Sequence, residues 1–364
     1  MINKEIEING KTLKISTGQV AKQAAGSVMV SYGETTIIAA VNAAKEMREN
    51  IDFFPLQVEY RERHYAGGKI PGGFFKREAR PSEREILTSR LTDRPIRPLF
   101  PKSFKYETQV IITVLTTDGE NPSDVLAGVA ASAALMVSNI PWKGPIATVR
   151  LAKVDENFVV NPTKSQMEES SMELVVSGNK DTIVMVEGEA DLIAEDVFVN
   201  ALKFAHEDIK KIIALQEDVV KEVNPQKRDI PDDAANDDLT AAIDKSISNK
   251  IDDIIQLADK SERESATSQL HQDTLESLEE KFPENEKEVK KIIDDKFKTA
   301  FRNKVLDTGV RSDGRGTTDI RDITIDPSFL PRTHGSVLFT RGETQALVVT
   351  TLGSKRDEQI IDSM

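Results

Sequence analysis

The sequence lacks cysteine and has only four histidines and one tryptophan among its 364 residues. Without cysteine the chain has no disulfide framework, no Cys-ligated zinc or iron–sulfur cluster and no thiol nucleophile. Neither an HExxH motif nor a paired spacing relates the histidines, so a histidine-ligated metal site is not expected. They are His64, His206, His271 and His334.

Long hydrophobic runs are also absent. The N-terminal residues alternate charged and aliphatic side chains, which is not the pattern of a signal peptide. The longest weakly polar stretch, residues 125–137, is much shorter than the roughly 20 residues that a membrane-spanning helix needs. We therefore expect a soluble, cytoplasmic protein with no membrane partner.

Positive charge is scarce overall, because 48 Lys and Arg face 61 Asp and Glu and give a net charge of −13. This balance argues against a nucleic-acid partner, since phosphate backbones are bound by clustered Lys and Arg. Residues 61–97 depart from the average, with ten basic and five acidic side chains. The excess indicates an anion-binding surface, and a merely solvated charged face is the alternative.

Residues 1–224 have the pattern of a mixed α/β domain. Alternating aliphatic residues flank Asn9-Gly10, which predicts a β-hairpin. Helical spacing predicts helices over 124–138, after a capping segment that ends at Ser123, and over 192–223. β-branched residues predict further strands over 27–32, 35–44, 54–60, 108–117, 146–154, 157–162, 172–179 and 182–189.

The composition changes after Asn224-Pro225. Residues 226–305 carry 14 basic and 20 acidic side chains, almost no aromatics, and Ile and Leu at helical spacing. This pattern predicts a small all-helical region, with a disordered acidic linker as the alternative. Strand composition then returns over 322–329, 336–341 and 344–352.

One internal repeat is visible in the sequence. GSVMVSYGETTIIAAV at 26–41 aligns without gaps with GSVLFTRGETQALVVT at 335–350, at a single offset of 309 residues. The match indicates a duplicated domain, with chance similarity between two strand pairs as the alternative. A second copy as long as the first does not fit before Met364, so we expect the chain to be truncated there.

A glycine-rich loop lies inside the basic stretch. The run from Gly67 to Gly73 is followed by Phe74-Phe75 and Lys76-Arg77. Aromatic residues beside basic residues are typical of single-stranded RNA binding, because the rings stack on unpaired bases while the cations bind phosphates. A core-anchoring role for the two phenylalanines is an equally good interpretation.

A capping box at Ser82 predicts a short helix that ends by Asp93. The arginines that follow, at i, i+4 and i+7, are suited either to converge on an anion or to form salt bridges with neighbouring carboxylates. The arginines are Arg90, Arg94 and Arg97, and the carboxylates are Glu83, Glu85 and Asp93.

These motifs resemble those of bacterial polynucleotide phosphorylases. DFFPL, GGKIPGGFF with its basic tail, ARPSE and LTDRPIRPLFP are similar to that family's first ribonuclease PH-type core domain. RSDGR at 311–315, LPRTHGS at 330–336 and TRGETQA at 340–346 resemble its second core domain. The resemblance covers essentially the whole chain and is weakest in the helical region.

The resemblance implies an α/β (α+β) fold with three parts. A ribonuclease PH-like core domain of mixed β-sheets with packed helices spans residues 1–224 and is the noncatalytic copy. An all-helical domain spans 225–305, and the first strands of a second ribonuclease PH-like domain occupy 306–364. In the family the intact protein is a homotrimer with further RNA-binding domains.

The resemblance also implies a Mg²⁺-dependent 3′-to-5′ exoribonuclease of mRNA degradation and RNA processing. Inorganic phosphate attacks the 3′-terminal phosphodiester of single-stranded RNA and releases a nucleoside diphosphate, reversibly. This chemistry needs a phosphate pocket, carboxylates that hold a metal, and a basic channel. The family's second copy supplies the first two, so no catalytic or metal residue is expected before Met364, and this chain alone is expected to be inactive.

The first copy has degenerate residues where an active copy binds phosphate and metal. Residues 117–124 contain three carboxylates instead of a Ser-rich loop, which would repel phosphate. Serines 165, 170 and 171 stand near the place of metal-binding aspartates, and Glu168-Glu169 is out of that register.

The residues that the resemblance carries over are RNA contacts. Those of the loop would line the channel of the trimeric ring, and two arginines after it would reach toward the active site. The RNA-binding residues are Phe74, Phe75, Lys76, Arg77, Arg80, Arg94, Arg97 and Arg341. An RNA-degradation complex with an endonuclease or helicase is a further implied partner.

One alternative remains open, and a second is not favoured by the sequence. The chain is suited to a noncatalytic role as an RNA-binding or assembly module of the same fold. A hydrolytic exoribonuclease would need its own acidic cluster, and the carboxylate spacing offers none.

Overall fold

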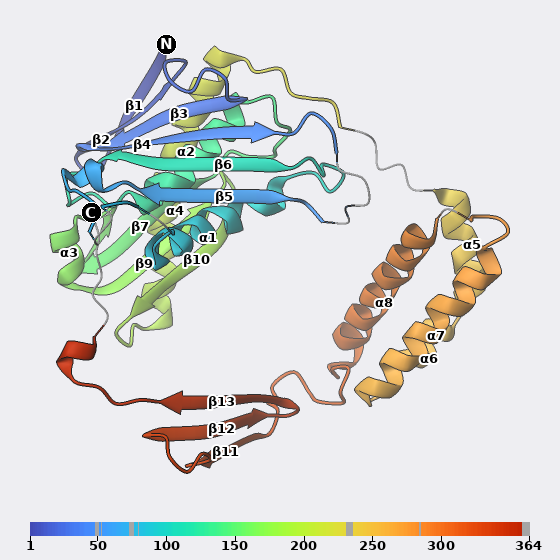
Figure 1. Ribbon diagram of the computed structural model, residues 1–364. Coiled ribbons are helices and arrows are strands. Elements are labelled where there is room, and N and C mark those ends of the chain that lie inside the picture. The colour runs from blue at the N-terminus through green and yellow to red at the C-terminus, as the bar shows by residue number, and fades with distance from the viewer. Residues whose placement is uncertain are drawn as a thin grey trace. The chain divides into compact units, whose positions relative to one another are not determined.

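The computed structural model describes residues 1–47, 51, 53–72, 76–78, 80–230, 236–283 and 285–358 (Figure 1). Contacts within the chain define two compact units, Met1–Asp232 and Asp233–Ile360. The first holds two β-sheets with packed helices, and the second holds four α-helices and a three-stranded sheet in its described part. No helix in the described residues combines the length and the apolar character needed to cross a bilayer.

The first sheet of unit 1 has six strands in the order β1-β2-β3-β4-β6-β5 (Figure 1). All neighbouring pairs are antiparallel except β5 and β6, which are parallel. The predicted hairpin is confirmed, because Asn9 and Gly10 join β1 to β2 with φ angles of 46° and 71°. The strands are β1 (Ile2–Ile8), β2 (Lys11–Thr17), β3 (Gly26–Tyr32), β4 (Thr35–Ala43), β5 (Leu56–Glu62) and β6 (Thr108–Thr116).

The second sheet of unit 1 has four strands in the order β10-β9-β7-β8. Its neighbouring strands are all antiparallel, and each overlaps a strand that the sequence predicts. The strands are β7 (Ala147–Val154), β8 (Asn157–Val160), β9 (Ser170–Gly178) and β10 (Ile183–Ala190). The short helix α3 (Lys164–Glu168) precedes β9.

Helix α2 (Asp124–Val137) contacts both sheets and α4 and is buried at 12 of its 14 positions. Small residues allow this close packing. A Cβ on Gly26 would lie 2.4 Å from a backbone oxygen of α2, and one on Gly128 would lie 2.3 Å from the Thr148 hydroxyl. The helix is apolar all round because protein surrounds it.

Helix α4 (Glu195–Val223) is amphipathic and contacts β1 and β7. The sequence predicts a start at Leu192, and the structure begins the helix three residues later. Leu192 has a φ of 50°, outside the right-handed helical region. Residues 226–230 follow α4 without regular secondary structure.

In unit 2, four helices share one apolar core. Leu239, Ile243, Val289, Ile293 and Phe297 are among its buried residues. Packed helices therefore account for this acidic region, and the disordered linker is not needed. The helices are α5 (Asp237–Ile247), α6 (Lys250–Ile254), α7 (Lys260–Leu278) and α8 (Glu286–Thr308).

The three-stranded sheet of unit 2 repeats a hairpin of unit 1. Strands β11 (Ile323–Pro327), β12 (Gly335–Arg341) and β13 (Thr344–Thr350) pair antiparallel in sequence order. Gly33 and Gly342 occupy the same turn position with φ angles of 59° and 60°. The end pairs Gly26–Val41 and Gly335–Thr350 also correspond at the offset of 309. The repeat is therefore structural as well as sequential.

Candidate nucleic-acid interface

Helix α1 (Glu83–Ile96) begins with the predicted capping box. The Ser82 hydroxyl accepts from the N–H of Glu85 at 3.2 Å, and the Glu85 carboxylate accepts from the N–H of Ser82 at 2.5 Å. The predicted end by Asp93 is wrong, because the helix continues past Pro95. Proline removes one N–H donor there without ending the helix.

Arg97 follows α1 directly, and its guanidinium is largely bound within unit 1. Its Nε and Nη2 donate to the Asp93 carboxylate at 2.8 and 2.7 Å. Nη1 donates to the Phe54 carbonyl at 3.1 Å, and Nη2 also donates to the Leu56 carbonyl at 3.0 Å. Of the salt bridges that the sequence offers as an alternative to anion binding, the one between Arg97 and Asp93 is present.

Helix α1 also binds the free edge of strand β5. Ser89 Oγ accepts from the Tyr60 N–H at 3.0 Å, and the Glu85 carboxylate accepts from the Glu62 N–H at 2.8 Å. Because β5 is an edge strand, these side chains satisfy backbone groups that would otherwise face solvent. The helix and the strand therefore form one rigid support for the basic residues.

Three of the arginines of residues 61–97 line one pocket of about 580 Å³ between β5 and α1. They are Arg61, Arg90 and Arg97. Asp93 lies in the same pocket and forms an ion pair with Arg97, while Arg90 is exposed. The structure thus collects residues that lie up to 36 positions apart in the sequence into one pocket, in which three arginines face the two carboxylates of Glu59 and Asp93.

Arg94 lies outside that pocket and forms an ion pair with Glu187 of β10. Both side chains remain about half exposed. A surface pair of this kind contributes little stability and competes weakly with a bound phosphate. The position of Arg94 is therefore compatible with either a salt bridge or an RNA contact.

Glu78 fixes the chain just after the glycine-rich loop. Its carboxylate accepts from Arg63 Nη1 at 2.5 Å and from the His64 N–H at 2.8 Å. Burial alone would raise the pKa of Glu78, but the hydrogen bonds from Arg63 and His64 outweigh it and hold the pKa below its usual range. Lys76 and Arg77, next to this anchor, are exposed.

The remaining predicted RNA contacts are placed as follows. Arg80 is exposed, and Arg341 ends β12 in unit 2, also exposed. Phe74 and Phe75 lie outside the described residues. The structure thus brings Arg97 together with Arg90 and leaves Arg77 and Arg80 on the surface.

In the loop before α2, which the sequence predicts to be a degenerate phosphate loop, the backbone N–H groups are bound by a carboxylate of the loop itself. Asp118 accepts from the backbone N–H groups of Asn121, Glu120 and Glu34 at 2.7, 3.0 and 3.2 Å. The Thr35 hydroxyl donates to it at 3.1 Å. Burial alone would raise the pKa of Asp118, but the hydrogen bonds from Asn121 and its neighbours outweigh it and lower the pKa to about 2. The loop's N–H donors are therefore used internally.

A buried arginine lies between two carboxylates on the inner side of the second sheet. Arg150 of β7 donates from Nη2 to the Asp124 carboxylate at 2.6 Å and forms an ion pair with Glu173 of β9. Its side chain is only 8% exposed. Sequence reasoning missed this group, although an arginine inside an otherwise apolar strand was a usable signal.

Ser165, before β9, and Ser170, the first residue of β9, make local hydrogen bonds. Ser165 Oγ donates to the Glu120 carboxylate at 2.7 Å, and Ser170 Oγ donates to the Met172 carbonyl at 2.6 Å. Glu168 and Glu169 are exposed. Across the described residues no three His, Asp or Glu side chains are grouped so as to hold a metal. Asp124 and Glu173 are both paired to Arg150, so these two carboxylates are already neutralised by a protein cation.

Three family models match the chain. "3' exoribonuclease family, domain 1" covers residues 9–141, and "3' exoribonuclease family, domain 2" covers residues 144–208. "Polyribonucleotide nucleotidyltransferase, RNA binding domain" covers residues 238–316. The first two fall on the two sheets of unit 1, which agrees with the ribonuclease PH-like fold that the sequence predicts.

A solved structure described as "archaeoglobus fulgidus exosome with RNA bound to the active site" is also similar, with a TM-score of 0.44. It is 21% identical and covers 55% of this chain and 86% of that chain. This likeness is too distant to carry an argument.

Curated relatives named polyribonucleotide nucleotidyltransferase match the chain along its length. That of Geotalea uraniireducens is 46% identical over 360 residues, which is 99% of this chain and 52% of the relative. That of Thermomicrobium roseum is 47% identical over 371 residues, or 99% and 47%. The chain spans about half the length of the curated relatives it matches. On these matches and on its fold, the chain belongs to the polyribonucleotide nucleotidyltransferase family.

Proposed function

We propose that this chain works within a phosphorolytic 3′-to-5′ exoribonuclease of single-stranded RNA. Its similarity to polyribonucleotide nucleotidyltransferases over 99% of its length is the observation that carries the proposal. An oxygen of inorganic phosphate attacks the phosphorus of the 3′-terminal phosphodiester, and the bond from phosphorus to the preceding 3′ oxygen breaks. The shortened RNA keeps that oxygen as a hydroxyl, and a nucleoside diphosphate leaves.

In this proposal the basic residues of unit 1 hold the RNA strand. Lys76, Arg77 and Arg80 bind phosphates from an exposed segment, and Phe74 and Phe75 stack on bases. The pocket between β5 and α1 offers a second set of cations.

Three further arginines of the proposal differ in how free they are to bind RNA. Arg94 exchanges its surface partner for a phosphate. Arg97 has four of its five N–H groups bound within the domain. Its main contribution is therefore to position the start of β5 and to keep a positive charge near the RNA. Arg341 contributes from the second unit.

The proposed organisation follows the internal repeat. Residues 1–224 form a first, noncatalytic ribonuclease PH-like domain, residues 225–305 a helical domain, and residues 306–364 the opening of a second such domain. We place the phosphate and Mg²⁺ ligands of the reaction in that second copy. In the first copy, Asp118 takes up the N–H groups of the loop before α2, and Arg150 pairs with Asp124 and Glu173. A cytoplasmic homotrimer that degrades mRNA, with an endonuclease or helicase as further partner, completes the proposal.

The proposal is tested with RNA, inorganic phosphate and Mg²⁺. A version of the protein with the full length of its relatives should release nucleoside diphosphates, and none in the absence of phosphate. The 364-residue chain should release none under either condition. Nucleoside monophosphates formed without phosphate would replace phosphorolysis by hydrolysis, and diphosphates from the 364-residue chain would overturn the placement of the ligands.

A second candidate function is an RNA-binding or assembly module without catalysis. It is favoured by the internal partners of two charged groups in unit 1, since Asp118 is bound by backbone N–H groups and Arg150 by Asp124 and Glu173. RNA binding by the full-length protein without any phosphate-dependent product would select this candidate.

A further inference from the structure

A pocket of about 590 Å³ lies between the C-terminal half of α8, the start of α7 and the segment after α8. Its apolar lining consists of Phe301, Val305 and Leu306, and its polar lining of three arginines and one serine. The polar residues are Arg263, Arg302, Arg311 and Ser312. Acidic side chains are absent from this lining, although acidic residues outnumber basic ones in residues 226–305.

Arg263 is a fixed cation at the edge of the pocket. Its Nη1 donates to the Leu257 carbonyl at 2.8 Å and to the Ser312 carbonyl at 3.4 Å. The guanidinium also lies over the Phe301 ring, with 5.8 Å to the ring centroid. Because the acceptors are neutral carbonyls and a ring, the positive charge is positioned without being cancelled.

Arg311 is held in the same manner. Its Nε donates to the Gly316 carbonyl at 2.7 Å, and its Nη2 donates to the carbonyls of Thr317 and Asp319. These acceptors are again neutral, so Arg311 keeps its charge and the N–H groups of Nη1. Arg302 is exposed, and the described part of the chain provides it with no hydrogen bond or ion pair.

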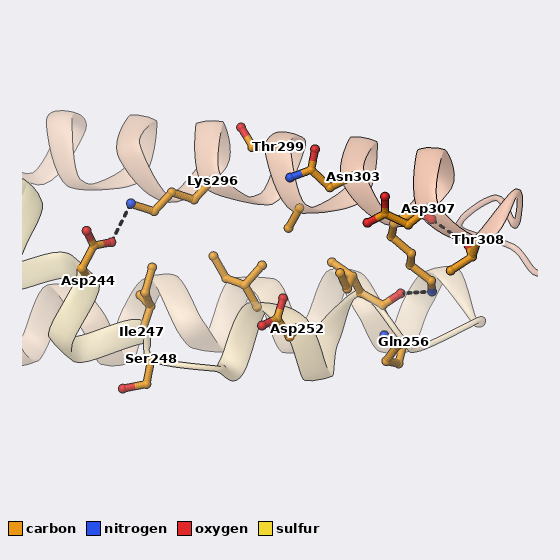
Figure 2. A pocket seen from close by; sticks show the side chains of 14 residues that line it. Asp244, Ile247, Ser248, Asp252, Gln256, Lys296, Thr299, Asn303, Asp307 and Thr308 are labelled. Carbon is orange, nitrogen blue, oxygen red and sulfur yellow. Dashed lines mark hydrogen bonds and ion pairs between the residues drawn. The ribbon is translucent and has the colours of Figure 1, made fainter.

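The opposite face of α8 behaves differently (Figure 2). A pocket of about 700 Å³ there is lined by Asp244, Asp252 and Asp307 among others. Lys296 forms an ion pair with Asp244 at 2.6 Å, and Lys304 donates to the Ile255 carbonyl at 2.7 Å. Carboxylates outnumber lysines in this lining, so it would repel an anion. Only one of these two faces of α8 therefore suits a phosphate.

Arginines without carboxylate partners, next to apolar side chains, suit a ligand that has both a phosphate and an apolar ring. Phosphates are bound by arginine forks, and nucleobases bind apolar and aromatic surfaces next to them. A simple anion would not need Val305 and Leu306, and an apolar ligand would not need three arginines.

We propose that this pocket binds one ribonucleotide unit, with its phosphate at Arg302 and Arg311 and its base against Leu306 and Phe301. The inference deepens the proposed function and rests on it, since a strand of RNA is the first source of such a unit. A free nucleoside diphosphate is the second source of the same chemistry. The pocket is then a second RNA contact, separate in sequence from the basic stretch of residues 61–97.

Crosslinking locates the site directly. A pentaribonucleotide with one 4-thiouridine is bound to the 364-residue chain without phosphate, irradiated, and mapped by mass spectrometry. Crosslinks to residues within 301–312 are expected. Crosslinks confined to unit 1 would overturn the proposal.

Substitution tests the arginine contact. Arg302→Glu should weaken pentamer binding about tenfold at low salt and reduce the salt slope by about one. Lys245→Glu on α5 makes the same charge change at an exposed position outside the pocket and should change affinity less than about twofold. Equal effects of the two variants would overturn the proposal, because charge alone would then explain the loss.

Competition separates the two sources. The competitors are added before irradiation. If adenosine diphosphate suppresses the crosslink at a concentration similar to that of unlabelled RNA, the ligand is a free nucleotide. If only RNA suppresses the crosslink, the ligand is the strand. Displacement by neither overturns the proposal. Since these measurements need no turnover, failure of the proposed phosphorolysis would leave them intact, and failure here would leave phosphorolysis intact.

Discussion

Arg150 and Asp124 join the second sheet of unit 1 to the first residue of α2. Nη2 of Arg150, on β7, lies 2.6 Å from Oδ2 of Asp124, and the side chains are 8% and 11% exposed. Glu173 of β9 neutralises the other side of the same guanidinium. Removing one member of such a buried ion group strongly destabilises the fold, because the remaining charges stay buried without a partner.

Replacement of Arg150 should therefore unfold unit 1 more easily. Arg150→Met is expected to lower the free energy of unfolding by about 3 kcal/mol. Urea unfolding followed by the fluorescence of Trp142, the single tryptophan and a buried residue of unit 1, measures this unit alone. Adding Asp124→Asn and Glu173→Gln should recover part of the loss, because no unpaired charge remains.

Lys221 provides the matched control for Arg150. It pairs with Asp218 on the surface of α4, where the two side chains are 74% and 58% exposed. Lys221→Met should change the free energy of unfolding by less than about 0.5 kcal/mol. A loss for Arg150→Met no larger than this control would mean that the buried pair does not support the fold.

Asp118 should make the stability of unit 1 depend on pH in the acidic range. Its pKa in the folded chain is about 2, below the value of about 3.9 that is usual for an unfolded chain. The stabilisation is therefore fully present above about pH 4 and is lost as the pH falls through 2.

Comparison with Asp118→Asn measures this contribution. Because Asp118 is only partly buried, we expect the wild-type chain to be more stable by an amount on the order of 1–2 kcal/mol near pH 6. The difference should shrink steadily toward pH 2. A difference that is the same at pH 6 and pH 3 would assign the effect to the lost hydrogen-bond geometry and not to the charge.

The parts of the fold that sequence could predict are those determined by neighbouring residues. Asn9 and Gly10 adopt the positive φ angles that their turn requires, and the Ser82 capping box needs a partner only three residues away. The end of α1 was misplaced because tertiary contacts support the helix past Pro95. Local propensity contains no information on such support.

The interior of the candidate site could not be predicted for a related reason. Asp124 and Glu173 lie 26 and 23 positions away from Arg150. The packing of α2 against β7 brings in Asp124, and the pairing of β7 with β9 brings in Glu173. The arginine itself was visible in the sequence as a charge inside a buried strand. Its partners were not, because many acidic residues compete for that assignment.

Arg97 offers a test that separates support of the fold from binding of RNA. Arg97→Lys keeps the charge but loses the fork that binds Asp93 together with the Phe54 and Leu56 carbonyls. The free energy of unfolding from Trp142 fluorescence should fall by about 1–2 kcal/mol, with the salt slope of RNA binding unchanged. Weaker RNA binding at unchanged stability would instead place the guanidinium on the RNA.

The exposed pair Arg77 and Arg80 should show the opposite behaviour. Arg77→Glu with Arg80→Glu is expected to weaken single-stranded RNA binding at least about tenfold at low salt and to reduce the salt slope by about two. Stability should not change, because both residues are exposed.

The matched control for this pair is Lys180→Glu with Lys203→Glu, which changes two other exposed positions of unit 1 by the same total charge. Fluorescence anisotropy of a labelled oligoribonucleotide, repeated at several salt concentrations, gives both the affinity and the slope. If the two double variants lost affinity equally, the effect would come from net charge, and residues 76–80 would be a solvated surface. If only the arginine pair lost affinity, the segment anchored by Glu78 would be an RNA contact, since the protein's overall charge is the same in both.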